Sequence, residues 1–369
     1  MFFVPKRLFK EKKTSYWIAL LGKISAVVIA IILFFSIINI IFSAYLSIRN
    51  PVQERFRTDT YKIPYPYIMF KGLPYWEDHN QEGYRGPYPV VPKPVDEYRI
   101  CILGGSTVYI GDPSLPVLLE EEFHKRGYYN VRVYNFGVIS AVSSQELMTI
   151  VTNLSNLQPD LIIQYDGVND LYHPLYYDPR PGYPYDYMMY EVSPLLYPER
   201  MSIWKFFISK LPVVQFFAER FAPEWYLNQF VPLTQIRNEA MYGSESWKNT
   251  IISVYSDNLQ KAHKISHAFG SEYIAILQPI LYDKLYLTDE EKPLVMSTEQ
   301  EWFRDMKKRV VDAMGNKNVY FVDLSSAVAN VEETMFMDIM HLYQESQARI
   351  AFSLYNIVVN IVNKDNAFY

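Results

Sequence analysis

The stretch YRICILGGST, residues 98–107, decides how the rest of this chain is interpreted. It contains a short apolar run that ends in two glycines, and Ser106 follows them directly. Such a run is typical of a buried strand. A serine that follows two glycines at a strand end can lie on a tight turn with its hydroxyl exposed. The stretch therefore predicts a buried strand and, at its end, a candidate nucleophile.

Downstream of residue 98, strand-like and helix-like segments alternate to the C-terminus. Further strands are expected at 131–136, 160–165, 272–278 and 319–323, and helices at 115–126, 143–156, 246–269, 298–314 and 343–362. Gly127 and Gly270 end two of these helices, and Ser143 or Ser144 can cap a third. Alternation of this kind predicts a parallel sheet covered on both faces, which is a three-layer α/β domain.

The N-terminal region predicts a membrane anchor. Residues 24–48 carry no formal charge, and as a helix they would span roughly 37 Å, enough to cross a hydrocarbon core of about 30 Å. The basic residues gather before this segment or in its first turns, which predicts a cytoplasmic N-terminus and an extracytoplasmic remainder. The alternative is a cleaved signal peptide, whose apolar region is about 7–15 residues long.

The composition divides the chain into four parts. We expect a basic cytoplasmic segment at 1–23, the anchor at 24–48, a stalk or extension rich in proline and aromatics at 49–97, and the α/β domain at 98–369. The aromatic content of 49–97 favours packing onto the main domain over a free linker.

An aromatic-rich insertion interrupts the α/β domain at 171–245. It is either a lid or substrate platform, or a structural insertion whose aromatics build a satellite core. Its part from Ile203 to Phe221 is amphipathic and aromatic enough to lie on a membrane surface.

Charge and cysteine content exclude several classes of function. The net charge of -5 leaves no basic footprint for nucleic acid, so no nucleic-acid partner is expected. The single cysteine, Cys101, rules out an internal disulfide and the cysteine-rich zinc patterns. His263 and His267 lie four residues apart on a predicted helix, but no third ligand is evident. We therefore expect no metal and no cofactor.

The residues at the predicted strand ends suit acyl transfer, because ligands of open α/β sheets bind beyond the carboxyl ends of the strands. His341 would take the proton of Ser106, and Asp338 would hold the imidazole by its other nitrogen. The backbone N–H groups of Ser106 and Gly137 and the side-chain amide of Asn169 would form an oxyanion hole. In the structural alternatives, Ser106 is an ordinary turn serine, His341 a structural histidine and Asn169 a helix cap.

The ordered set Ser106, Gly137, Asn169 and His341 resembles the four blocks of the SGNH, or GDSL, hydrolases, and the aspartate three residues before the histidine follows that family's pattern. The resemblance covers roughly residues 98–170 and 319–363. It implies a flavodoxin-like α/β/α sandwich that hydrolyses carboxylic esters without a metal. Gly105 stands where the family usually has aspartate, a form similar to that of membrane-anchored bacterial members.

Together these features predict a membrane-anchored serine esterase that removes O-acyl groups, O-acetyl in particular, from a cell-envelope glycan or lipid. An O-acyltransferase with the same triad is the first alternative. The second is a non-catalytic scaffold that binds glycans. The string Glu82–Gly86 resembles a segment that precedes such domains and is assigned no catalytic role.

Overall fold

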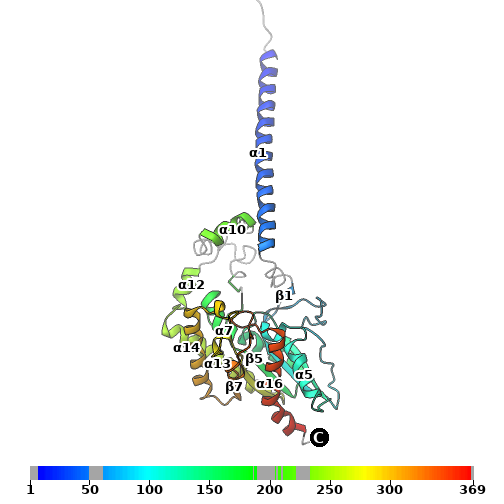
Figure 1. Ribbon diagram of the computed structural model, residues 1–369. Coiled ribbons are helices and arrows are strands. Elements are labelled where there is room, and N and C mark those ends of the chain that lie inside the picture. Colours follow the sequence, from blue (N-terminus) through cyan, green and yellow to red (C-terminus); the bar gives the residue numbers. More distant parts are fainter. Residues whose placement is uncertain are drawn as a thin grey trace, which may run out of the picture. The chain divides into compact units, whose positions relative to one another are not determined.

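The computed structural model describes residues 7–49, 61–185, 187–188, 204, 207–208, 211–221 and 233–366. The chain forms two compact units, which are considered separately (Figure 1). The larger unit contains 58–190 and 233–369, and the smaller contains 1–57 and 191–232. The predicted insertion at 171–245 is thus divided between the two units.

The larger unit is built on a parallel sheet. In the described part of the chain its five strands have the order β4-β3-β5-β6-β7. Their bounds are β3 Tyr98–Gly104, β4 Val131–Gly137, β5 Leu161–Asp166, β6 Glu272–Leu277 and β7 Phe321–Asp323. When these five strands are numbered in chain order, their order across the sheet is the flavodoxin-like 2-1-3-4-5. The switch point of this topology lies between β3 and β5. The predicted fold class is confirmed.

Helices cover both faces of the sheet because the strands alternate their apolar side chains. Cys101 and Leu103 pack with α6 (Ser143–Thr152), α13 (Glu245–Ala268) and α14 (Ser297–Met314). Ile100 and Ile102 point to the opposite face, where they pack with α5 (Leu115–His124) and α16 (Gln344–Asn366). Figure 1 shows α5 and α16 side by side. The shorter helices are α4 Ser106–Tyr109, α7 Val168–Tyr176, α12 Leu233–Glu239 and α15 Ser326–Ala329.

Neither predicted serine cap of α6 is present. Val142 occupies the N-cap position, with no side-chain capping bond. The Ser143 hydroxyl instead donates to Asp170 at 2.6 Å, and the Ser144 hydroxyl donates to the carbonyl of Gly182 at 2.5 Å. Tertiary partners have therefore replaced the backbone N–H groups from which a capping serine would accept.

The described part of the extension, residues 61–97, belongs to the larger unit. It begins with a hairpin of β1 (Lys62–Tyr65) and β2 (Met69–Gly72). Farther along, the buried ring of Tyr84 lies 4.7 Å from that of Phe136 on β4. The aromatic side chains of this segment therefore pack onto the α/β domain.

In the smaller unit, α1 runs from Arg7 to Arg49 (Figure 1). Its segment Ala19–Tyr45 is long and apolar enough to cross a membrane, a test that a signal sequence also passes. The same unit contains α10, Pro212–Phe221, which comes from the insertion. Of the predicted amphipathic stretch 203–221, residues 203, 205–206 and 209–210 lie outside the described residues.

Candidate active site

Three side chains from two distant parts of the sequence meet at the carboxyl edge of the sheet. Ser106 is the first residue of α4, directly after β3. Its Oγ lies 2.7 Å from Nε2 of His341, and Nδ1 of His341 lies 2.6 Å from Oδ2 of Asp338. The structure thus brings the predicted nucleophile, base and orienting carboxylate into one hydrogen-bonded line.

Asp338 and His341 lie on a hairpin-like loop that follows α15. The Met337 N–H donates to the His341 carbonyl at 2.8 Å, and the Asp338 Oδ1 accepts the N–H groups of Met340 and His341, each at 2.8 Å. Burial alone would raise the pKa of the Asp338 carboxyl, but the hydrogen bonds from His341 and these N–H groups lower it below its ordinary value. The carboxylate is therefore ionised and pre-positioned for the imidazole.

A buried ion pair supports the base of this loop. Glu291 Oε1 accepts the N–H groups of Met335 and Phe336 at 2.8 and 3.2 Å. Lys284 Nζ donates to Glu291 Oε2 at 2.5 Å and to the Glu333 carbonyl at 2.6 Å. Both residues of the pair were missed by the sequence analysis, because nothing in a single lysine and a single glutamate marks them as partners of a distant loop.

Asn169 lies beside the turn of the nucleophile. Its Nδ2 donates to the carbonyl of Ala141 at 2.7 Å, which leaves the second amide hydrogen available. A Cβ at Gly105 would lie 2.4 Å from this nitrogen. Gly105 has a φ of -85°, so its backbone does not require glycine. The residue is small because the Asn169 amide occupies the adjacent space.

Gly137 does not present a free N–H to the site. Its N–H donates to Oδ1 of Asn135 at 2.8 Å, and it would have to give up this bond to serve as an oxyanion donor. A Cβ at Gly137 would lie 2.9 Å from the Val108 side chain and from the backbone nitrogen of Tyr109. Here glycine lets α4 approach β4 closely.

The loop after β4 offers another N–H. Ala141 N donates to the Val138 carbonyl at 3.0 Å, which closes a turn with Ile139 and Ser140 at its centre. Ser140 has a φ of 64°, as the third position of a type II turn requires, and its N–H takes no part in closing the turn. Because a serine carries no sign of positive φ in the sequence, this candidate donor was missed.

A cluster of buried carboxyl groups lies behind Asn169. Asp170 accepts from the N–H and the hydroxyl of Ser143 at 2.9 and 2.6 Å, and Asp166 accepts from the Tyr255 hydroxyl at 2.7 Å. Burial, reinforced by the charge of Asp166, raises the pKa of Asp170 to about 7. Burial likewise raises the pKa of Glu146 and of Asp166. Asp166 is the last residue of β5 and belongs to this buried cluster.

The extension braces the segment that follows the nucleophile. Arg85 donates to the carbonyls of Tyr109 and Gly111 at 2.7 and 2.8 Å and to Asp78 at 2.7 Å. His79 Nε2 lies 2.7 Å from the Tyr109 hydroxyl. These side chains support the end of α4, a role the sequence did not reveal.

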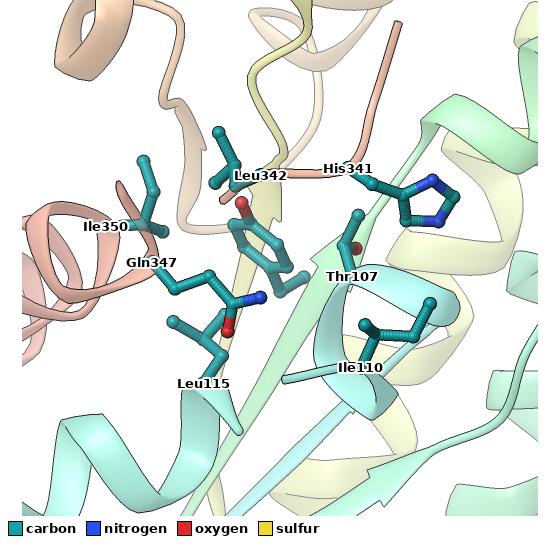
Figure 2. Close-up of a pocket in the computed structure, with 8 residues that line it drawn as sticks. Thr107, Ile110, Leu115, His341, Leu342, Gln347 and Ile350 are labelled. Carbon is teal, nitrogen blue, oxygen red and sulfur yellow. The ribbon is translucent and has the colours of Figure 1, made fainter. Parts of the chain in front are cut away.

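A small pocket adjoins the catalytic loop. It has a volume of about 10 Å³, room for roughly one water molecule. Figure 2 shows Thr107 and His341 on one side of it, and Leu115, Gln347 and Ile350 on the other. Within the described residues, no group of three or more His, Cys, Asp or Glu side chains is placed to hold a metal ion.

No family model matches the chain, and no curated protein is detectably similar to it. Among solved structures, it is similar to the acetyl xylan esterase AlAXEase, with 10% identity and a TM-score of 0.42 over 70% of this chain and 99% of that one. A GDSL-like lipase from Bacteroides thetaiotaomicron VPI-5482 has 10% identity and a TM-score of 0.40 over 74% and 93%. A lipase/acylhydrolase from Enterococcus faecalis has 14% identity and a TM-score of 0.39 over 70% and 95%. Similarity at this level carries no argument about activity, which has to come from the site.

Proposed function

We propose that the chain is a serine esterase of SGNH type with Ser106 as its nucleophile. The observation that carries this proposal is the continuous line from Ser106 Oγ through His341 to Asp338, with separations of 2.7 and 2.6 Å. Such a line is what a hydroxyl needs to become a nucleophile near neutral pH. Glycan binding alone does not require this hydrogen-bonded line of serine, histidine and aspartate.

In the proposed reaction, Ser106 Oγ attacks the ester carbonyl while its proton passes to Nε2 of His341. The carbonyl π electrons move to the oxygen, and the charge is stabilised by the Ser106 N–H, the second hydrogen of the Asn169 amide and the Ser140 N–H. The C–O bond to the alcohol then breaks as His341 protonates the leaving oxygen. Water, deprotonated by His341, then attacks the carbonyl carbon of the acyl-enzyme. The bond to Ser106 Oγ breaks as His341 returns the proton to it, and the carboxylic acid is released.

The proposed acyl group is short, with acetyl as the preferred case. The proposed substrates are O-acylated glycans or lipids of the cell envelope. They follow from a second element of the proposal, in which Ala19–Tyr45 anchors the chain with its basic N-terminus in the cytoplasm.

The test uses the full chain purified in detergent, with Ser106→Ala and Ser253→Ala as a matched pair. Ser253 lies on the exposed face of α13, outside the site. We expect the parent and Ser253→Ala to hydrolyse p-nitrophenyl acetate and to prefer it to the octanoate, while Ser106→Ala is inactive and folded. A fluorophosphonate probe should add its mass to Ser106 alone.

An active Ser106→Ala variant, or labelling at another serine, would refute the assignment. Adding sugar acceptors to the same assay tests the alternative of acyl transfer. If p-nitrophenol is released only with an acceptor, and the acceptor becomes acylated, the chain is an O-acyltransferase that uses the same residues.

A further inference from the structure

In the smaller unit, helix α10 packs against the end of the apolar segment of α1. The ring of Phe42 lies 4.8 Å from that of Phe216 and 5.7 Å from that of Phe217, measured between centroids. The ring of Tyr45 lies 5.7 Å from that of Phe216. These contacts place α10 beside the last turns of Ala19–Tyr45.

A polar contact defines the same level on α1. The Val213 N–H, in the first turn of α10, donates to Oδ1 of Asn39 at 3.3 Å. The Asn39 amide itself donates to the Phe35 carbonyl at 2.8 Å, so its side chain is held along the helix. Asn39 thus satisfies one of the N–H groups that the start of a helix leaves without an intrahelical partner.

Two aromatic side chains of α10 are left uncovered by the described residues of its unit. Phe217 is 49% exposed and Phe221 71% exposed. Leu211, just before the helix, and Trp204, Phe207 and Ile208 of the same unit are also exposed. So many large apolar side chains in one short region mark a surface that is covered by something other than water.

We propose that α10 lies in the outer headgroup region of the bilayer that α1 crosses, with phospholipid covering Phe217 and Phe221. An element that packs on Asn39 to Tyr45 lies at the depth of those residues. At 1.5 Å per residue they span about 9 Å from the end of the segment, which matches the roughly 5–10 Å to which interfacial helices sink. Arg220, exposed in the last turn, supplies a charge of the sign that lipid phosphates attract.

This inference rests on the proposed anchor, and it adds a second membrane contact from the middle of the chain. The α/β domain is then linked to the membrane through the segment after α1 and through both ends of the segment that carries α10.

The experiment measures the depth of spin labels in the full chain. Cys101, the single cysteine of the sequence, is buried, and the substitution Cys101→Ala removes it. Single cysteines are introduced by Phe217→Cys, Phe221→Cys, Ile32→Cys and Lys261→Cys, then labelled and reconstituted in phosphatidylethanolamine–phosphatidylglycerol nanodiscs. Ile32 lies mid-segment in α1, and Lys261 is exposed on α13. Oxygen dissolves in the bilayer, so fast relaxation of a label by oxygen shows that the label lies in lipid. Fast relaxation by a water-soluble nickel chelate shows that the label is exposed to solvent.

We expect oxygen to relax the labels at positions 32, 217 and 221 more strongly than the nickel chelate does. At position 261 we expect the nickel chelate to have the stronger effect. A lipid signal at Ile32 with nickel dominant at Phe217 and Phe221 would overturn the interfacial position while leaving the anchor intact. Labels at Phe217 and Phe221 that are shielded from both reagents and coupled between copies would overturn it in favour of a protein contact. Loss of the lipid signal at Ile32 would instead refute the anchor.

Discussion

Lys284 and Glu291 form an ion pair of 2.5 Å from which solvent is excluded, and Glu291 also binds the backbone at the base of the catalytic loop. Replacing Lys284 by methionine leaves an unpaired buried carboxylate. We expect Lys284→Met to lower the free energy of unfolding by about 3–5 kcal/mol, as measured by urea denaturation.

The control for that variant is Lys292→Met. Lys292 pairs with Asp289 at 2.7 Å on the exposed surface of the same segment. Water solvates both partners there, so we expect little measurable change. Equal losses in the two variants would show that the buried pair has no special role.

Gly105→Ala should impair catalysis with little effect on folding. The new methyl group would lie 2.4 Å from Asn169 Nδ2 and would displace the amide. Losing one oxyanion donor costs on the order of 10²–10³ in kcat, and that is the expected loss with p-nitrophenyl acetate. Gly315→Ala is the control, because its Cβ would meet nothing closer than 3.6 Å. Unchanged kcat in Gly105→Ala would remove Asn169 from the mechanism.

Two substitutions at Ser140 test its backbone as an oxyanion donor. Glycine tolerates the φ of 64° at no steric cost, whereas a β-branched residue does not. We therefore expect Ser140→Gly to retain kcat and Ser140→Val to lower it, with circular dichroism showing both folded. If Ser140→Gly is as impaired as Ser140→Val, the hydroxyl rather than the backbone N–H matters.

The buried carboxyl groups of Glu146, Asp166 and Asp170 predict that the protein loses stability as the pH rises. Burial raises their pKa values, so the folded state holds protons that the unfolded chain has released, and the free energy of unfolding falls with pH. The stabilising contribution of these three groups is fully present below about pH 4, where the carboxyl groups of the unfolded chain are also protonated. For Asp170 the loss continues to about pH 7, the pKa of its folded state.

Glu146→Gln removes one of these groups, so the stability of the variant should decrease less as the pH rises. We expect the variant to have a higher Tm than the parent at pH 8, and the difference to be smaller at pH 5. Glu121→Gln, on the exposed side of α5, is the control and should leave the profile unchanged. A parallel shift of the Glu146→Gln profile at every pH would indicate a packing effect instead of a titration.

The strands and main helices were predictable because their signals are local. The runs 100–103 and 273–277 are apolar and buried, as is typical of strands covered on both faces, and glycines end α5 and α13 within a few residues of the expected positions. The predicted cap of α6 was wrong, because the Ser143 hydroxyl accepts from the distant Asn258 amide and donates to the distant Asp170 carboxylate.

The sequence by itself determined the strand-end chemistry: Ser106 after β3, Asn169 after β5, and Asp338 with His341 near the C-terminus. Only the tertiary structure decided which groups meet there. It joined His341 to Ser106, Asp170 to Ser143, and Glu291 to the backbone of Met335 at the base of the catalytic loop. The physical reason is that hydrogen bonds and burial depend on distances between segments far apart in the chain, and a residue's type records neither.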